Sequence, residues 1–301
     1  MRIAHFSDLH VLALADVPPW RFLNKRLTGW ANLRFKRNHA HRSDTVRLVA
    51  REVRARGVDH VAITGDLTNL ALESEFALAH EILEHEMGLG PDEISIVPGN
   101  HDLYTAGALR AKRFTSFFEK YTRCDLDVAV DIGAGHFPFV KLRGPAAIIG
   151  LSSAVPRPPL VASGKLGRAQ LGALDRALAH PEVRRRTPVV LVHHPVHNPP
   201  SRIKTALEGL WDARALRDRL AGVPRGLVLH GHLHRRVRCD VSGGVVAVGA
   251  TSASLHHEHE HRMAGFNLYE LDDATGAVRT IEAHVLDEDT GRFSVESIPH
   301  A

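Results

Sequence analysis

The stretch Ile94-Ser95-Ile96-Val97-Pro98-Gly99-Asn100-His101-Asp102 decides how the rest of the chain is interpreted. A β-branched run that stops at Pro-Gly is typical of a buried strand that delivers its next residues to the edge of a sheet. The three polar side chains after it supply a neutral oxygen, a titratable ring and a carboxylate. That combination is typical of a metal-assisted hydrolytic site, although a polar loop after a core strand would explain this stretch taken alone.

The same pattern recurs four more times along the chain. Apolar runs at 2–6, 60–64, 187–192 and 226–229 also read as strands, and polar residues follow each of them. The five motifs are Asp8-x-His10, Gly65-Asp66, Gly99-Asn100-His101-Asp102, His193-His194-Pro195 and Gly231-His232-x-His234. Because ligands collect at the carboxyl ends of the strands in α/β sheets, we expect the fold to gather these motifs at one edge of a sheet. Turn formation alone does not explain five such sets.

The order of expected strands and helices predicts the fold class. Helical patterns at 44–56 and 73–87 alternate with the first three strands, which indicates an α/β protein with a largely parallel sheet. A further helix is expected at 107–121, whereas the Pro-containing segment 196–206 is expected to be irregular. Beyond His234 the pattern becomes antiparallel, with strands expected at 235–240, 244–249, 265–271, 277–285 and 292–298. We expect a single domain over 1–301, with a cap-like insertion at 17–42 and antiparallel C-terminal strands at 235–301.

The donor atoms in the five motifs indicate the kind of metal centre. Four His, two Asp and one Asn are too many ligands for one tetrahedral zinc ion. They suffice for two ions if one carboxylate bridges them. Mixed carboxylate, amide and imidazole donors favour Fe, Mn or Zn over Mg or Ca. We therefore expect two divalent or trivalent metal ions as cofactors.

Composition sets the broad class of protein. The 301 residues carry a net charge of +4, which favours anionic ligands without requiring nucleic acid, and no specific nucleic-acid partner is predicted. Cys124 and Cys239 give no disulfide framework, so a reducing cytoplasm is the expected location. The sequence supports neither a signal peptide nor a membrane-spanning helix. It does not predict an oligomeric state.

The insertion at 17–42 is basic and contains no acidic residue. Its residues Trp20, Leu23, Leu27 and Trp30 are spaced as on one face of a helix. Such a segment could bind an anionic membrane through 20–37, which would make the protein peripheral to the membrane, or cover the mouth of a site for an anionic substrate. Equally, its apolar face could pack on the domain while its charges stay in solvent.

A second unusual segment is the tract His256-His257-Glu258-His259-Glu260-His261. It has the composition of a metal-binding tract, but it falls between two expected strands. A solvated loop is the interpretation that we favour.

The five motifs together resemble those of the calcineurin-like metallophosphoesterase superfamily, namely D-x-H, G-D, G-N-H-D/E, H and G-H-x-H. The resemblance spans residues 8 to 234. It implies a four-layer α/β/β/α sandwich of mixed sheets flanked by helices. It also implies a hydrolase of phosphate esters with a binuclear metal centre, in which bound cations lower the pKa of water enough for attack at neutral pH.

The resemblance also implies roles for individual residues. Asp8, His10 and His234 would hold the first ion, Asn100, His193 and His232 the second, and Asp66 would bridge both. His193 is preferred to His194 because it lies two residues before Pro195. His101 would protonate the leaving oxygen or contact the phosphate, with Asp102 orienting it. His194 and Asn69 would bind the substrate.

The substrate is expected to be a small anionic phosphoester. Resemblance to class III cyclic nucleotide phosphodiesterases favours a phosphodiester of the nucleotide type. The basic insertion favours an alternative, hydrolysis of a lipid-linked substrate of the UDP-2,3-diacylglucosamine type. A third hypothesis, a metal-binding scaffold without catalysis, is weakened because every motif residue is present.

Overall fold

Two six-stranded sheets form the centre of the molecule in a computed structural model that describes residues 1–15, 17–27 and 42–301. The first sheet contains β1 (Arg2–Phe6), β2 (His60–Ile63), β3 (Ile94–Ile96), β12 (Gly265–Leu271), β13 (Val278–Asp287) and β14 (Arg292–Ser297). The second contains β6 (Phe139–Arg143), β7 (Ala146–Gly150), β8 (Thr187–Leu191), β9 (Gly226–His230), β10 (Val237–Ser242) and β11 (Val245–Gly249). A small separate pair consists of β4 (Val130–Asp131) and β5 (His136–Phe137).

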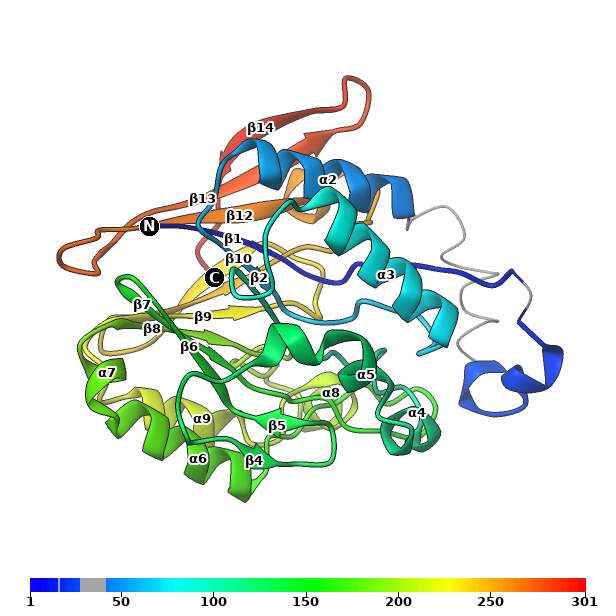
Figure 1. Cartoon of the computed structure of the whole chain (residues 1–301), viewed down its shortest axis with the longest axis horizontal. Coiled ribbons are helices and arrows are strands. Elements are labelled where there is room, and N and C mark those ends of the chain that lie inside the picture. The colour runs from blue at the N-terminus through cyan, green and yellow to red at the C-terminus, as the bar shows by residue number, and fades with distance from the viewer. Residues whose placement is uncertain (16, 28–41) are drawn as a thin grey trace.

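Helices cover the outer faces of the two sheets. The α-helices are α2 (Ser43–Ala55), α3 (Glu73–Glu86), α4 (Ala106–Arg110), α5 (Arg113–Phe118), α6 (Arg168–Ala179), α7 (Pro181–Arg184), α8 (Arg202–Glu208) and α9 (Ala213–Leu220). Short 3₁₀ turns lie at η1 (Pro19–Phe22), η3 (Glu119–Thr122) and η4 (Glu260–Arg262). Figure 1 shows α2 and α3 outside the first sheet and α6, α7 and α9 outside the second. Within the described residues, no helix is both long enough and apolar enough to cross a membrane.

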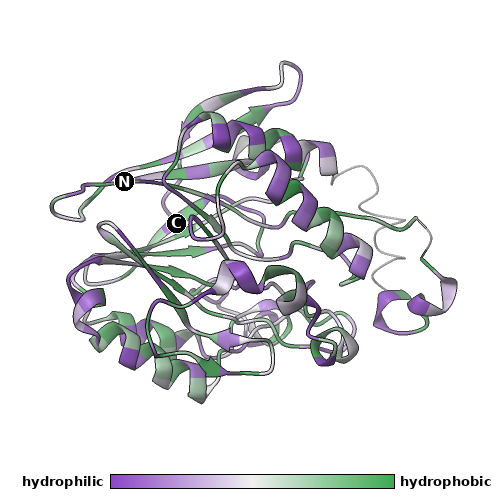
Figure 2. Cartoon of the chain, in the orientation of Figure 1, coloured by the Kyte–Doolittle hydropathy of each residue, from purple (hydrophilic) through white to green (hydrophobic). Residues whose placement is uncertain are grey.

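Alternation along the strands builds the core between these layers. In β8, Val189 and Leu191 belong to the cluster shared with the first sheet, whereas Val190 packs with the helices on the other side. Apolar side chains of α2 such as Val49 close the opposite layer. Figure 2 shows the same pattern, with apolar strands inside and polar residues on the outer turns of the helices. The predicted four-layer α/β/β/α sandwich is confirmed.

Strand order explains how distant parts of the chain meet. β1 pairs in parallel with β2, which pairs in parallel with β3, and β1 also pairs antiparallel with β12. The first sheet has the order β14-β13-β12-β1-β2-β3, so the C-terminal strands complete it. The second has the order β10-β11-β9-β8-β7-β6, in which β7, β8, β9 and β11 are parallel. Both sheets are therefore mixed.

Two helical segments differ from the sequence prediction. The helix expected at 107–121 is divided into α4, α5 and η3, because Lys112 adopts a left-handed φ of 48° between the first two. α8 lies in a Pro-containing stretch, 196–206, that was expected to be irregular. Ser201 caps it by accepting a hydrogen bond from the Lys204 backbone N–H at 3.3 Å.

The described part of the insertion, 17–27, is anchored by its basic side chains. Arg21 forms an ion pair with Glu73, and Arg26 donates to the carbonyl of Leu70 at 2.7 Å. The described residues here do not form one continuous helix, because η1 is followed by a turn at 23–24 before helical residues resume at 25–27. The apolar members of that face, Trp20, Leu23 and Leu27, are 68%, 79% and 50% exposed and do not pack on the domain. Trp30 and residues 28–41 lie outside the described residues.

Candidate metal centre

The polar residues after β1, β2, β3, β8 and β9 come together at one end of the two sheets. Backbone hydrogen bonds join the first two motifs, with Asp8 N–H donating to the carbonyl of Gly65 and His10 N–H to that of Asp66, both at 2.9 Å. In the second sheet, Gly231 N–H donates to the carbonyl of His193 at 3.0 Å. The motifs therefore meet between two facing sheets, and the expectation of a single sheet edge was wrong.

Asp8, His10 and His234 form the first group of donor atoms. The Nε2 atom of His234 lies 3.1 Å from Oδ1 of Asp8 and 3.1 Å from Nε2 of His10. All three ligand atoms of this group lie within 4.8 Å of one another. Two imidazole nitrogens and a carboxylate oxygen converging on one point provide a suitable donor set for a transition-metal ion.

Asn100, His193 and His232 surround the second point. The hydrogen bond from Nδ1–H of His193 to the Thr64 carbonyl, at 2.6 Å, directs Nε2 inward. The hydrogen bond from Nε2–H of His232 to the Glu208 carbonyl, at 2.9 Å, directs Nδ1 inward. These inward nitrogens lie 3.1 and 3.0 Å from Oδ1 of Asn100.

This second arrangement requires positive charge at its centre. Burial lowers the pKa of His232 to about 3, so its inward nitrogen presents a lone pair to the Asn100 oxygen. Burial is the strongest influence and opposes the charged form of His193. The charge of Asp66, the hydrogen bonds to Asp66 and to the Thr64 carbonyl, and the charge of Asp8 together overcome it and raise the pKa of His193 to about 9. The acceptors on Asn100, His232 and Asp66 repel one another unless positive charge lies among them, supplied either by protonated His193 or by a bound cation. A metal ion coordinated by these residues satisfies that requirement, so the donor set fits a metal centre.

Asp66 connects the two points. Its Oδ2 atom lies 3.3 Å from Nε2 of His193 and 3.9 Å from Nε2 of His10. It belongs to two groups of potential ligands among the described residues, one with His10 and His101 and one with His193 and His232. Burial alone would raise the pKa of Asp66, but the charges of His193 and His101 hold it well below its usual value. A carboxylate shared between two groups is the geometry that a binuclear centre needs.

Five of the seven candidate ligands have a left-handed backbone. The φ angles are 54° for Asp8, 44° for His10, 52° for Asp66, 71° for His232 and 48° for His234. Such conformations cost roughly 1–3 kcal/mol each and cluster at functional sites. The neighbouring glycine Gly99 is needed for space, because a Cβ atom there would lie 2.2 Å from Oδ1 of Asp66.

His101 lies beside both groups and is held by a backbone carbonyl. Its Nδ1–H donates to the carbonyl of Asn69 at 2.6 Å, and its backbone N–H donates to Oδ1 of Asp66 at 2.7 Å. Its ring stacks on Tyr104 with the ring centroids 5.3 Å apart. The ring is therefore fixed in direction at the edge of the metal centre.

Asp102 does not orient His101, and that prediction was wrong. Its carboxylate accepts from the backbone N–H of Gly99 at 2.9 Å and from the backbone N–H of Thr68 at 3.0 Å. Burial, together with the charge of Asp66, raises the pKa of Asp102 to about 7. Asp102 stabilises the turn that carries Asn100. The Asn69 carbonyl, rather than Asp102, holds the His101 ring in its orientation.

The two residues expected to bind the substrate have structural contacts instead. The Asn69 amide donates to the backbone carbonyls of His10 and Val11. In His194, Nε2–H donates to the Ala162 carbonyl at 2.7 Å, and Nδ1 lies 2.8 Å from the Ser153 hydroxyl. Both side chains are buried, and neither is among the described residues that line the pocket at the metal centre. These contacts favour structural roles, and substrate binding by either residue stays a prediction.

Comparison with known proteins identifies the family to which the chain belongs. The family profile of the calcineurin-like phosphoesterases matches residues 1–236. The chain belongs to this family. No curated protein sequence matches the chain. Among solved structures, the fold of this phosphoesterase is similar to that of a dimetal phosphatase from Danio rerio, with 15% identity, a TM-score of 0.61 and coverage of 90% of this chain and 92% of the other.

Two further structures share the fold at low identity. One is purple acid phosphatase PPD1 from yellow lupin, with 12% identity, a TM-score of 0.57 and coverage of 97% of this chain and 52% of the lupin chain. The other is GAP50, the anchor in the inner membrane complex of Plasmodium, with 11% identity, a TM-score of 0.51 and coverage of 99% and 88%. At these identities the likeness shows the fold alone.

The pocket of this phosphoesterase includes residues other than the proposed metal ligands. It measures about 440 Å³, and Glu208, Leu233, Leu255, His257 and Arg262 line it together with motif residues. Most of these come from α8 and from the loop before β12. No motif spacing marks them in the sequence, although Leu233 lies inside the last motif. The pocket therefore combines a polar metal-binding floor with a mixed apolar and charged rim.

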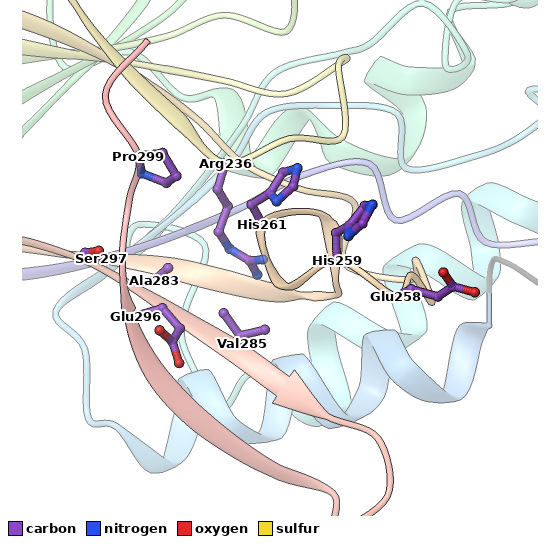
Figure 3. A pocket seen from close by; sticks show the side chains of 9 residues that line it. All are labelled: Arg236, Glu258, His259, His261, Ala283, Val285, Glu296, Ser297 and Pro299. Atoms are coloured by element: carbon purple, nitrogen blue, oxygen red, sulfur yellow. The ribbon is translucent and has the colours of Figure 1, made fainter.

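The His-rich tract divides between two places. His257 lines the metal pocket, whereas His259 and His261 line a separate hollow of about 470 Å³ with the buried Arg236 (Figure 3). Among the side chains that the structure describes, the tract forms no group of three potential metal ligands. The expectation of a plain solvated loop is therefore incomplete, because one of its residues lies at the metal centre.

Proposed function

We propose that this chain hydrolyses phosphodiesters at a binuclear metal centre. The observation that carries the proposal is the position of Asp66, whose carboxylate lies between two groups of imidazole donors. Hydrolysis of phosphate esters is the reaction class of the family to which the chain belongs. The proposed ligands are Asp8, His10 and His234 for one ion, Asn100, His193 and His232 for the other, and Asp66 for both.

A pair of bound cations would polarise the phosphoryl group and make water acidic enough to attack at neutral pH. The chain itself supplies orientation and a proton. His101, held by the Asn69 carbonyl and stacked on Tyr104, donates the proton to the leaving oxygen. Asp102 keeps the Gly99–Asn100 turn in place so that His101 and Asn100 project together.

A diester fits the pocket better than a monoester. An alkoxide leaving group is poor in either kind of ester, so the acid that His101 provides serves both, and the rim of the pocket makes the distinction. Leu233 and Leu255 on the rim offer apolar contact to the second ester substituent, while Arg262 supplies positive charge. A monoester has no second substituent to contact the two leucines, and its additional negative charge makes repulsion by Glu208 stronger than for a diester.

A lipid-linked substrate is the second candidate, and the exposed Trp20, Leu23 and Leu27 favour it. In that case these side chains would contact the acyl chains or the lipid surface while the metal centre cleaves the diester or pyrophosphate. Replacing all three by Ser should then reduce turnover of UDP-linked diacyl lipids but leave turnover of a soluble aryl phosphodiester unchanged. Equal turnover of the lipid by both proteins would reject this candidate.

The decisive experiment is Asp66→Asn, which keeps the size of the side chain and removes its charge. We expect the variant to lose bound metal by elemental analysis and to lose turnover of aryl phosphodiesters and cyclic nucleotides. Asp131→Asn, on the exposed strand β4, is the matched control and should retain both. Full metal-dependent activity in Asp66→Asn would contradict the proposal. Bound metal in the wild type without turnover of any phosphoester would support a scaffold instead.

A further inference from the structure

A short helix beside the metal pocket presents its apolar side chains to solvent. α8, all of whose residues are described, contains no buried residue. Its apolar residues Ile203 and Leu207 are 74% and 43% exposed and lie on the same side, because residues four apart are neighbours on a helix. A surface helix normally packs such side chains against the core. α8 presents them to the outside.

A neighbouring loop extends this apolar surface. Ala162 N–H donates to the carbonyl of Leu207 at 2.7 Å, and Trp211 N–H donates to the carbonyl of Gly164 at 3.0 Å. These bonds hold the loop at 157–164 against the segment 207–211. The loop carries Leu160, which is 90% exposed, and the segment ends in the half-exposed Trp211. We call Leu160, Ile203, Leu207 and Trp211 the α8 face.

Positive charge surrounds the α8 face. Arg202 and Lys204 flank Ile203 on the helix, and both are exposed. The guanidinium of Arg157 lies 3.7 Å from the centroid of the Trp211 ring. Exposed apolar side chains bordered by Arg, Lys and Trp are typical of segments that lie in the interface of a membrane.

The nearby carboxylates point elsewhere. Glu208, at the end of α8, lines the metal pocket. Asp212 accepts hydrogen bonds from the backbone N–H groups of Leu166 and Gly167, at 3.0 and 2.8 Å. The charge that borders the α8 face is therefore mainly positive, and it complements an anionic surface.

Charge also distinguishes between occupants of this surface. A second copy of the chain, related by a twofold axis, would bring Arg202 and Lys204 of both copies into the same interface. Such like-charge contacts oppose association. Anionic headgroups would instead pair with these cations while the apolar side chains enter the boundary with the acyl chains.

We propose that the α8 face docks this protein on an anionic lipid bilayer. The Glu208 carbonyl accepts a hydrogen bond from His232, so a bilayer at the α8 face would lie beside the mouth of the metal pocket. The surface is separate from Trp20, Leu23 and Leu27 of the insertion. Docking does not depend on bound metal or on the proposed reaction, so the two proposals can fail independently.

Co-sedimentation of the full chain with vesicles tests the proposal. The vesicles contain phosphatidylcholine either alone or mixed with phosphatidylserine. We expect binding to the anionic vesicles, a large loss of binding in Ile203→Ser/Leu207→Ser, and a loss of about fivefold for each cation removed in Arg202→Gln/Lys204→Gln. Because these side chains are exposed, the variants should melt at the wild-type temperature. The matched control is Val295→Ser, an exposed apolar position on β14, which should bind as the wild type does.

Three results would overturn the inference. They are absence of binding to anionic vesicles, binding that Ile203→Ser/Leu207→Ser does not weaken, and a wild-type dimer in sedimentation velocity that the same variant dissociates. The last would assign the α8 face to self-association. Turnover of a soluble aryl phosphodiester, measured in parallel, should be unchanged in the α8 variants. A wild-type protein that turns over phosphodiesters but does not bind anionic vesicles would reject docking alone. A wild-type protein that binds the vesicles but has no turnover would reject the reaction alone.

Discussion

Replacing His101 by Gln removes a titratable proton from the edge of the metal centre while keeping a side chain that can still donate to the Asn69 carbonyl. A positioned general acid contributes about 10²–10⁴-fold to rate. We therefore expect kcat for an alkyl phosphodiester to fall by that factor, which corresponds to about 3–5 kcal/mol of transition-state stabilisation. The contacts of Asp66 with His193 do not involve the imidazole of His101, so both metal ions should remain bound.

The leaving group separates an acid from a residue that merely shapes the pocket. An aryl oxide departs without a proton, so the loss in His101→Gln should be small for an aryl diester and large for an alkyl diester of similar size. The assay is kcat for both substrates with metal content measured on the same samples. A loss that is equal for the two substrates, or the disappearance of one metal ion, would refute the role of His101 as the acid.

Three further perturbations follow from individual contacts. Burial raises the pKa of Glu75 from 4.5 to about 8, so the folded protein keeps a proton that the unfolded chain releases between these pH values. Stability therefore falls as pH rises through this window, and urea unfolding should show Glu75→Gln gaining stability relative to the wild type as the pH increases. Gly231→Ala would place a Cβ atom 2.0 Å from Oγ of Ser7 and 2.3 Å from Oδ2 of Asp8, and should weaken metal affinity by about 10–100-fold in a chelator competition. Chelation should lower the thermal midpoint, with recovery on adding Mn²⁺, because metal at a hundred times its Kd stabilises by about 2.7 kcal/mol; an unchanged midpoint would argue against a metal centre in the folded state.

The strands and the polar motifs at their ends could be predicted because both depend on local patterns, whereas the meeting of the motifs between two sheets could not. A β-branched run followed by Gly and a polar triplet implies a strand end wherever the strand is placed. The direction of each side chain could not be predicted in the same way. Asp102 and Asn69 are polar residues near the right strand ends, yet each bonds a backbone group of another loop, Thr68 for Asp102 and Val11 for Asn69. The sequence does not encode which carbonyl or amide will face them.

The rim of the pocket was missed for a related reason. Glu208 and Arg262 come from segments that carry no motif, and they reach the metal centre because the second sheet and the loop before β12 bring them there. α8 was missed because Pro199 and Pro200 precede it, and prolines usually interrupt helices. Here both prolines precede the Ser201 cap, so neither removes a hydrogen bond within the helix. The exposed Trp20 and Leu23 show the limit of periodicity, which predicts a face but does not say what the face contacts.

The left-handed backbone at Asp8, His10, Asp66, His232 and His234 restricts how the metal preference of this site can be redesigned or can drift. Outside glycine, Asp, Asn and His are the residues that tolerate this conformation best. A swap to Cys for a softer metal, or to Glu for a longer reach, would change the donor and strain the main chain in the same step. Exchanges within Asp, Asn and His avoid that strain, so they are the substitutions by which this centre could change its charge while keeping its shape.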